Sequence, residues 1–248
     1  MPHLKLLRLA LSFYTRVPSP SVQDYQDLPK ATVFLPLIGW LVGGVAALIF
    51  ILADLLWSQA TAVILAFIAG IFLTGAFHED GFADVCDGFG GGYTQQRILE
   101  IMKDSAIGVY GCLGLVLIFL LKFNLLNDAQ ASAVPLMLLV GHSLSRLSPL
   151  LLMHHYEYAR ADHSKAAAAV YKPTPSELTL ATTIAVLPLV LLPKLCWLAV
   201  LPVLVVNAFL GRYFYRHIGG YTGDCLGASQ QVAEVVFYFS VQGLWIYI

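Results

Sequence analysis

Four carboxylates lie within nine residues of a chain that carries few other charges. They are Glu79, Asp80, Asp84 and Asp87, in the run H-E-D-G-F-A-D-V-C-D-G-F-G-G-G that starts at His78, whereas charged residues make up only 12% of the sequence. Three of them follow an i, i+4, i+7 spacing, which places them on one face of a helix. Such a cluster favours a hard divalent cation held by oxygen, magnesium or manganese rather than zinc. A solvated acidic loop is the alternative.

A glycine-rich run and a second polar group follow the acids. Gly90 and Gly91 belong to the run, whose backbone can approach a phosphate closely, although a flexible loop explains it equally well. Lys103, Asp104 and Ser105 then lead into an apolar segment. This combination suits phosphoryl transfer, in which cations neutralise the phosphates and a carboxylate takes the proton of the attacking hydroxyl.

Arg146 lies inside an otherwise apolar segment, where a charge is costly and usually faces a cavity or a partner. His142 precedes it by four residues and therefore shares its helical face. We expect Arg146 to bind a diphosphate or carboxylate of the substrate. The alternative is a structural ion pair with Asp54 or Glu234.

Thr222 and Asp224 lie in a polar, glycine-rich turn near the carboxyl end of the chain. Because the glycines permit close approach, we expect both side chains to complete a substrate site. Capping of the last helix by Asp224 is the alternative.

The elements that position these residues are predicted to be transmembrane helices. Hydrophobic residues make up 58% of the 248 residues, and the mean hydropathy is +0.76, which is typical of integral membrane proteins. We predict a single all-α membrane domain over residues 1–248, a bundle of about seven spans of roughly 20 residues each. The expected spans are residues 33–57, 60–77, 107–126, 131–153, 175–192, a sixth from the turn at 193–194 to 210, and 226–248. The net charge of −1 argues against a nucleic-acid partner.

The segments outside the spans have their own signals. Residues 3–16 form an amphipathic pattern that predicts a helix lying in the membrane interface, and no small-residue cleavage site supports a signal peptide instead. Pro18, Pro20 and Pro29 mark an extended linker, and residues 174–177 have the form of a capping box. The four cysteines are irregularly spaced, so we expect reduced thiols.

The basic residues indicate the orientation. If the amino terminus is cytoplasmic, the long connections face the cytoplasm and only Lys122 and Lys194 lie toward the far side, with Lys122 close enough to one end of its span to snorkel. The cytoplasmic set is Lys5, Arg8, Arg16, Lys30, Arg97, Lys103, Arg160, Lys165, Lys172, Arg212 and Arg216. The acidic stretch is therefore predicted to be cytoplasmic.

Three separated segments resemble the signature motifs of the cobalamin synthase family, the adenosylcobinamide-GDP ribazoletransferases of B12 synthesis. They are residues 78–88, residues 101–111 (I-M-K-D-S and I-G-V-Y-G) and residues 219–228 (G-G-Y-T-G-D-C-L-G-A). Residues 12–18 (S-F-Y-T-R-V-P) and 34–39 (F-L-P-L-I-G) are similar to the opening of that family. The resemblance covers nearly the whole chain in order.

The resemblance implies a multi-pass enzyme of the bacterial inner membrane, with its active site on the cytoplasmic face. In the implied reaction, the ribose 3′-hydroxyl of α-ribazole or its 5′-phosphate attacks the cobinamide-linked phosphorus of adenosylcobinamide-GDP, and GMP leaves. The family's usual metal is Mg²⁺. The matching acids are Asp80, Asp84 and Asp87, with Glu79 a weaker ligand candidate. The resemblance leaves room for a homo-oligomer and for association with other enzymes of nucleotide-loop assembly.

The run from Asp84 to Gly88 also has the D-x-x-D-G form that opens the motif of CDP-alcohol phosphotransferases, but the rest of that motif is missing. We assign Asp104 as the general base, with Asp80 as its main competitor. Two other functions stay open: a CDP-alcohol phosphotransferase of lipid synthesis, and a transporter that uses Arg146 and Glu234 as an intramembrane relay.

Overall fold

The structure is a computed structural model that describes residues 2–18, 27–159 and 171–248. In this part of the chain every regular element is helical, and the only extended pairing is a single bridge between Tyr158 and Tyr221. The predicted all-α class is therefore confirmed. Pro20 of the expected linker, and Arg160 and Lys165 of the polar loop, lie outside the described residues.

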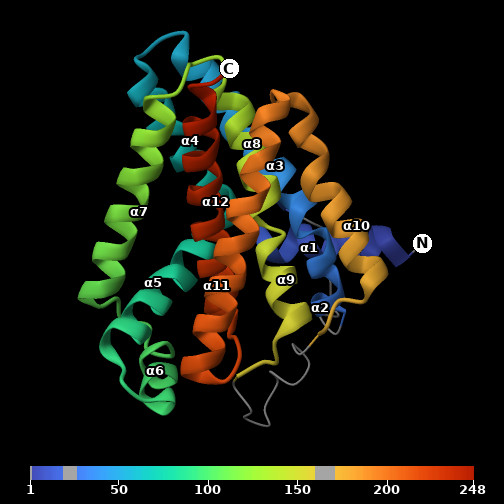
Figure 1. The fold of residues 1–248 in the computed structure, drawn as a ribbon, viewed down its shortest axis with the longest axis vertical. Helices are drawn as coiled ribbons and strands as arrows, with labels where there is room; N and C mark the ends of the chain where they lie inside the picture. Colours follow the sequence, from blue (N-terminus) through green and yellow to red (C-terminus); the bar gives the residue numbers. More distant parts are fainter. Residues whose placement is uncertain (1, 19–26, 160–170) are drawn as a thin grey trace.

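Most of the long helices run along the longest axis of the molecule, whereas α1 lies across it and α5 is inclined to it (Figure 1). In chain order they are α1 (Pro2–Tyr14), α2 (Leu28–Ala31), η1 (Thr32–Phe34), α3 (Leu35–Asp54), α4 (Gln59–Thr74), α5 (Phe77–Gly91), α6 (Gln95–Ile101), α7 (Val109–Asn127), α8 (Val134–Ser145), α9 (Ser148–His155), α10 (Pro175–Val186), η3 (Leu187–Leu191), η4 (Lys194–Ala199), α11 (Val200–Ile218) and α12 (Gly223–Trp245).

Within the described residues, four stretches are long and apolar enough to cross a membrane, fewer than the seven expected. They are Leu28–Asp54, Val109–Asn127, Val134–His155 and Lys194–Ile218, and the bent pair of α4 and α5 makes a fifth if it is one span. The expected fifth span is the shorter apolar stretch Pro175–Leu191. The expected seventh is α12, which has 23 residues but buries polar side chains such as Gln230, Gln231 and Glu234 inside the bundle.

The break between α4 and α5 turns the chain by 92°. Gly75 ends α4 in the left-handed region at φ 69°, and Ala76 follows at φ 59°. Glycine adopts this conformation without a steric cost, so it commonly ends helices. The acidic stretch is therefore a separate helix, rather than a straight continuation of the second span.

Side-chain caps begin α4 and α10. Ser58 caps α4 by accepting a hydrogen bond from the backbone N–H of Thr61, which closes the tight hairpin after α3. Thr174 and Glu177 form the expected capping box at the start of α10. The amino-terminal segment is helical, and its Leu9 and Ala10 are fully buried against the bundle. All four cysteines are free thiols.

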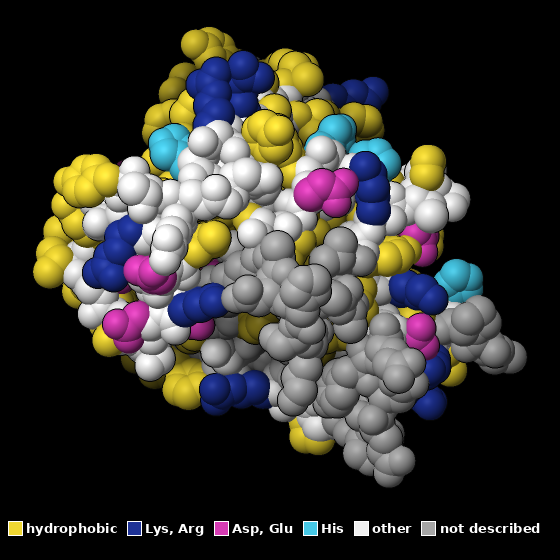
Figure 2. All heavy atoms as spheres, turned by 90° about the horizontal axis from the view of Figure 1, so that it is seen from below, with side chains coloured by type: hydrophobic (Ala, Val, Ile, Leu, Met, Phe, Trp, Pro, Cys, Tyr) yellow, Lys and Arg dark blue, Asp and Glu magenta, His cyan; other side chains and the backbone are white. Residues whose placement is uncertain are grey.

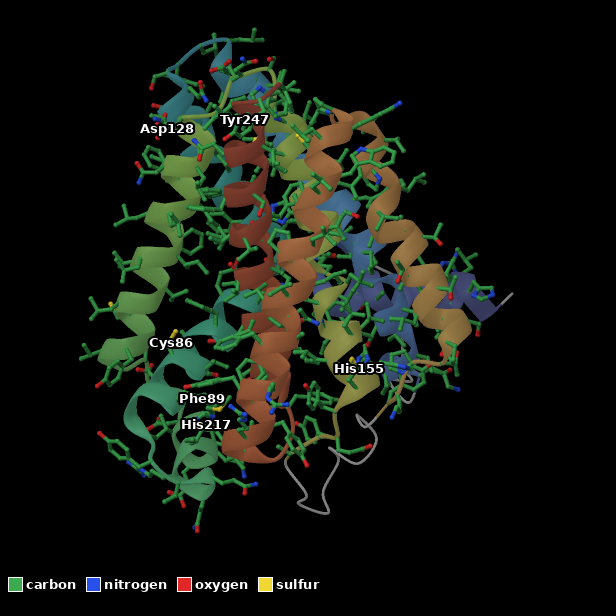
Figure 3. All side chains as sticks on the ribbon, viewed as in Figure 1. Cys86, Phe89, Asp128, His155, His217 and Tyr247 are labelled. Atoms are coloured by element: carbon green, nitrogen blue, oxygen red, sulfur yellow. The ribbon has the colours of Figure 1, made fainter. Side chains whose placement is uncertain are left out.

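The connections gather at two ends, as the alternation of short and long connections predicts. Asp128 in the α7–α8 turn and Tyr247 after α12 lie at one end, whereas His155 and His217 lie at the other (Figure 3). Seen from this second end, Lys, Arg, Asp and Glu side chains are spread over the surface (Figure 2). The polar segments of the chain are thus gathered at the end where α5 and α6 lie.

Candidate active site

The three aspartates of the acidic stretch lie on one helix, as predicted. Helix α5 contains all of them and runs from the middle of the bundle toward its lower end (Figure 1). Their surroundings differ, because Asp80 is exposed, Asp84 is half-buried and Asp87 is buried. The three carboxylates are therefore not equivalent.

Asp87 holds the start of α7. Its Oδ2 accepts a hydrogen bond from the backbone N–H of Gly108 at 2.7 Å, and its Oδ1 accepts one from Gly111 at 2.9 Å. A Cβ atom added to Gly108 would lie 2.8 Å from Cγ of Asp87, so glycine is needed for this approach. A carboxylate bonded to the first N–H groups of a helix is stabilised by charge-assisted hydrogen bonds and by the helix dipole.

Replacing Asp87 with alanine is expected to lower the free energy of unfolding by about 1–3 kcal/mol, because the buried N–H of Gly111 and the part-buried N–H of Gly108 lose their acceptor. Thermal unfolding of the detergent-solubilised protein, followed by circular dichroism, measures the effect. Asp80→Ala on the same helix is the matched control, since Asp80 is exposed and its loss is expected to change stability by less than about 0.5 kcal/mol. Equal melting temperatures for the two variants would contradict the structural role of Asp87.

Glu79 points away from the aspartates and into the bundle. Its Oε1 accepts a hydrogen bond from Gln231 Nε2 at 3.0 Å, and its Oε2 is buried without a partner among the described residues. Because residue 79 lies on another face of α5 than Asp80, the metal-ligand prediction for Glu79 loses its geometric basis. Glu79 belongs instead to a buried polar cluster.

This buried polar cluster joins α7 and α12 to α8. Lys122 Nζ lies 2.9 Å from Glu234 Oε1 and donates to Gln231 Oε1 at 2.7 Å. Glu234 Oε2 is 3.3 Å from Nδ1 of His142. Lys122 is only 3% exposed, so the prediction that it snorkels to the membrane surface is wrong. Its ammonium turns inward because a carboxylate and an amide oxygen are available there.

Arg146 lies in the same region and is 2% exposed. Its Nη1 donates to the carbonyl oxygen of His142 at 2.9 Å, and its Nε has no partner among the described residues. Arg146 lines, with Glu79 and Glu234, a cavity of about 20 Å³, which has room for one water molecule. Asp54 and Glu234 were the two candidate ion-pair partners of Arg146, and only Glu234 lines this cavity with it. A diphosphate can reach Arg146 only if the cavity widens.

The start of α12 packs directly on the acidic helix. A Cβ atom added to Gly81, which follows Asp80, would lie 2.9 Å from Cα of Asp224. The absence of a side chain at residue 81 thus brings Asp224 against the turn of α5 that carries Asp80 and Asp84. Thr222 caps α12 by accepting a hydrogen bond from the N–H of Cys225, so the alternative of capping by Asp224 is wrong. Asp224 is a half-buried residue of the first turn.

Lys103, Asp104 and Ser105 are exposed and lie between α6 and α7. Asp104 Oδ1 accepts a hydrogen bond from the N–H of Ala106 at 3.0 Å. The far end of this segment is fixed by the bond from Gly108 to Asp87, so the segment lies beside the carboxyl-terminal half of α5. The predicted base and the predicted phosphate contacts are therefore at the same end of the molecule as the acidic helix.

Gly90 and Gly91 are the last residues of α5 rather than parts of a loop. A Cβ atom on Gly90 would lie 2.6 Å from Cγ of Tyr110. Gly90 therefore lets the Tyr110 ring pack closely against the end of α5. Phosphate binding by these glycines stays a prediction.

The donor set on α5 and α12 fits a hard cation in its chemistry. Among the described residues no three histidine, cysteine or acidic side chains are already close enough to hold a metal ion. Asp80, Asp84 and Asp224 nevertheless supply only oxygen donors around the Gly81 contact, which matches the ligand preference of Mg²⁺. Asp80 is exposed and Asp84 and Asp224 are half-buried, and Thr222 Oγ1 donates to Asp224 Oδ2 at 3.3 Å.

Sequence reasoning missed the partners of the buried charges and the cap that Asp87 provides. One signal was available, because Gln230 and Glu234 share a face of α12 at i, i+4 and Gln231 adjoins them. Gln230 Nε2 donates to Glu234 Oε2 at 2.7 Å. A polar face on an otherwise apolar helix indicates polar partners, although it does not say which they are.

Comparison with known proteins gives a full-length match. The model of the family described as cobalamin-5-phosphate synthase matches residues 6–242. The adenosylcobinamide-GDP ribazoletransferase of Shewanella amazonensis is 44% identical over 250 residues, which cover 98% of this chain and 96% of the relative. The protein of the same name from Ralstonia pickettii is 37% identical over 245 residues, which cover 96% and 95%. No solved structure matches significantly.

Proposed function

This chain belongs to the cobalamin-5-phosphate synthase family and is an adenosylcobinamide-GDP ribazoletransferase, and we propose that the acidic helix α5 and the start of α12 form its active site. The full-length match argues against the two alternative functions, a CDP-alcohol phosphotransferase and a transporter. The observation that carries the proposed site is the packing of Asp224 on Gly81, which joins the first and third signature motifs.

The transfer joins an alcohol to a phosphorus atom and releases a nucleotide. The 3′-oxygen of α-ribazole or its 5′-phosphate forms a bond to the cobinamide-linked phosphorus of adenosylcobinamide-GDP. The bond from that phosphorus to the bridging oxygen breaks, and GMP leaves with that oxygen. One proton must leave the attacking hydroxyl, so a carboxylate near the reacting phosphorus is required.

We assign Mg²⁺ binding to Asp80 and Asp84, with Asp224 as a third donor. When bound, Mg²⁺ neutralises the diphosphate charge and stabilises the departing phosphate. Asp87, whose oxygens already hold α7, supports this arrangement mainly by fixing α7 against α5. Asp104 remains the proposed base and Asp80 its competitor. Lys103 and Ser105 are proposed to contact the phosphates from the exposed segment.

We place the active site at the cytoplasmic face of a bacterial inner membrane. The end of the bundle that carries α5 and α6 also carries Lys103, Arg212 and Arg216, and cytoplasmic connections of membrane proteins are rich in Lys and Arg. Water-soluble nucleotides reach this face directly. Tagging the α6–α7 segment and testing its accessibility in oriented vesicles checks the orientation.

Purified protein in liposomes, given adenosylcobinamide-GDP, α-ribazole 5′-phosphate and Mg²⁺, is expected to release GMP and form a cobamide. Chelation with EDTA should reduce GMP release by at least about 100-fold, and added Mg²⁺ should restore it, because the ion supplies several kcal/mol of transition-state stabilisation. Liquid chromatography with mass spectrometry measures both products. Product formation that is unchanged in EDTA would remove the metal from the proposed mechanism.

A further inference from the structure

An apolar pocket of about 190 Å³ lies beside the proposed active site. Its walls come from α1, α3, α5, α9 and the start of α12, and they include the rings of Tyr14, Phe77, Tyr158 and Tyr221. The ring centroids of Tyr14 and Phe77 are 5.7 Å apart, and those of Tyr158 and Tyr221 are 5.6 Å apart, both edge to face. The pocket is therefore bounded by aromatic rings whose positions are fixed by one another.

The pocket and the proposed active site share two helices. Gly223 and Gly227 of α12 line the pocket and flank Asp224 in the chain. Phe77 of α5 also lines it and precedes Asp80 by three residues, which places both on the same side of the helix. A ligand in this pocket can therefore extend a polar group past Gly223 toward the carboxylates of Asp80 and Asp224.

The described walls contain one histidine, His78, beside their aromatic and aliphatic side chains. Among the described residues that line the pocket there is no Asp, Glu, Lys or Arg. The Tyr14 hydroxyl is 3.2 Å from Thr32 Oγ1 and is thus already paired. Burial raises the pKa of Tyr221 to about 12, so this phenol stays uncharged at neutral pH. Such walls do not bind phosphate, but they suit a flat apolar ring.

The substrates of the reaction offer one group of this kind. A buried apolar cavity of about 150 Å³ takes up a benzene molecule, so a space of about 190 Å³ matches a small bicyclic ring and not a corrin. The guanine of the nucleotide has donors and acceptors around its edge that these walls cannot satisfy. We propose that this pocket binds the aromatic base of α-ribazole and so delivers the ribose hydroxyl to the carboxylates. This assignment rests on the proposed active site.

Filling the pocket tests the proposal. Gly223 lines the pocket, and its Cβ position has nothing within 4 Å, so Gly223→Leu adds a side chain at the pocket wall without a clash at Cβ. The affinity of purified protein in nanodiscs for α-ribazole, measured by calorimetry, should fall at least about tenfold, while the affinity for adenosylcobinamide-GDP stays within about twofold. Gly243→Leu is the matched control on the same helix, because its Cβ position is also open, and it should change neither affinity.

A second variant enlarges the pocket and does not depend on the first. Met153 lines the pocket. Met153→Ala should raise the kcat/KM for the riboside of a tricyclic base by about tenfold, relative to the kcat/KM for α-ribazole, because a buried methylene group changes discrimination by that order. If the parent enzyme turns over normally but neither variant changes base binding or base preference, the pocket assignment fails and the active site stands. If the parent releases no GMP, the proposed function itself fails. Loss of a bound acyl chain from Gly223→Leu, seen by mass spectrometry with α-ribazole affinity unchanged, would overturn the proposal in favour of a lipid site.

Discussion

Asp84→Asn is expected to reduce GMP release by about 10³-fold or more while leaving the protein folded and inserted. The substitution keeps the size of the side chain but removes its charge, and a metal ligand supplies several kcal/mol of transition-state stabilisation, so a loss of about 4 kcal/mol is expected. Asp84 lies half-buried on α5, one turn after Asp80 and next to the helix turn that contacts Asp224. Initial rates at saturating substrates measure the effect.

The Mg²⁺ dependence of the remaining rate separates a metal ligand from a structural residue. Asparagine still offers one oxygen, so a higher Mg²⁺ concentration should recover part of the activity of Asp84→Asn. Asp128→Asn is the matched control, because Asp128 is exposed and lies at the opposite end of the bundle (Figure 3). Rates within about threefold of the parent for Asp84→Asn would remove it from the metal site.

The helical elements could be predicted from the sequence because each depends on local signals. The spans at residues 33–57, 107–126 and 131–153 correspond to stretches that the structure also makes long and apolar. Thr174 and Glu177 indicated the start of α10, because their side chains form a capping box. Hydrophobic runs and caps act within a few residues of the chain, so one sequence contains them.

What could not be predicted depends on residues far apart in the chain. The role of Asp87 is set by Gly108 and Gly111, which come 21 and 24 residues later. The i, i+4, i+7 spacing gave the shared helix correctly, but it could not reveal that one carboxylate was already bonded to backbone N–H groups. Likewise, Lys122 turns inward because of Glu234, which is 112 residues away. Polar partners inside a bundle are fixed by tertiary packing, not by local pattern.

The bend after α4 is an intermediate case. Gly75 marked a natural helix end, but the left-handed conformation of Ala76 had no local signal. The backbone N–H of Arg16 donates to the carbonyl of Leu73 at 2.8 Å, so the end of α1 braces α4 just before this turn. A distant segment thus supports the angle at which the acidic helix leaves α4, and through it the position of the proposed site.

Lys122→Met is expected to lower the free energy of unfolding by about 3–5 kcal/mol, more than any other substitution that we propose. Removing one partner of a buried ion pair leaves the other charge unpaired. Lys122 and Glu234 are 3% and 2% exposed and 2.9 Å apart. Thermal unfolding in detergent measures the loss. Lys194→Met at the far end of the bundle is the matched control, since Lys194 is exposed and should change stability by less than about 0.5 kcal/mol.

The double variant Lys122→Met, Glu234→Met distinguishes an unpaired charge from lost packing. Replacing both partners of a buried pair by apolar residues is often nearly neutral, so most of the lost stability should return. Recovery should be incomplete, because Gln230 and Tyr238 also donate hydrogen bonds to Glu234, at 2.7 and 3.3 Å. If the double variant is no more stable than Lys122→Met alone, the loss comes from packing around the methylene groups of Lys122. If Lys194→Met is equally destabilised, the buried pair has no special role in holding α7 against α12.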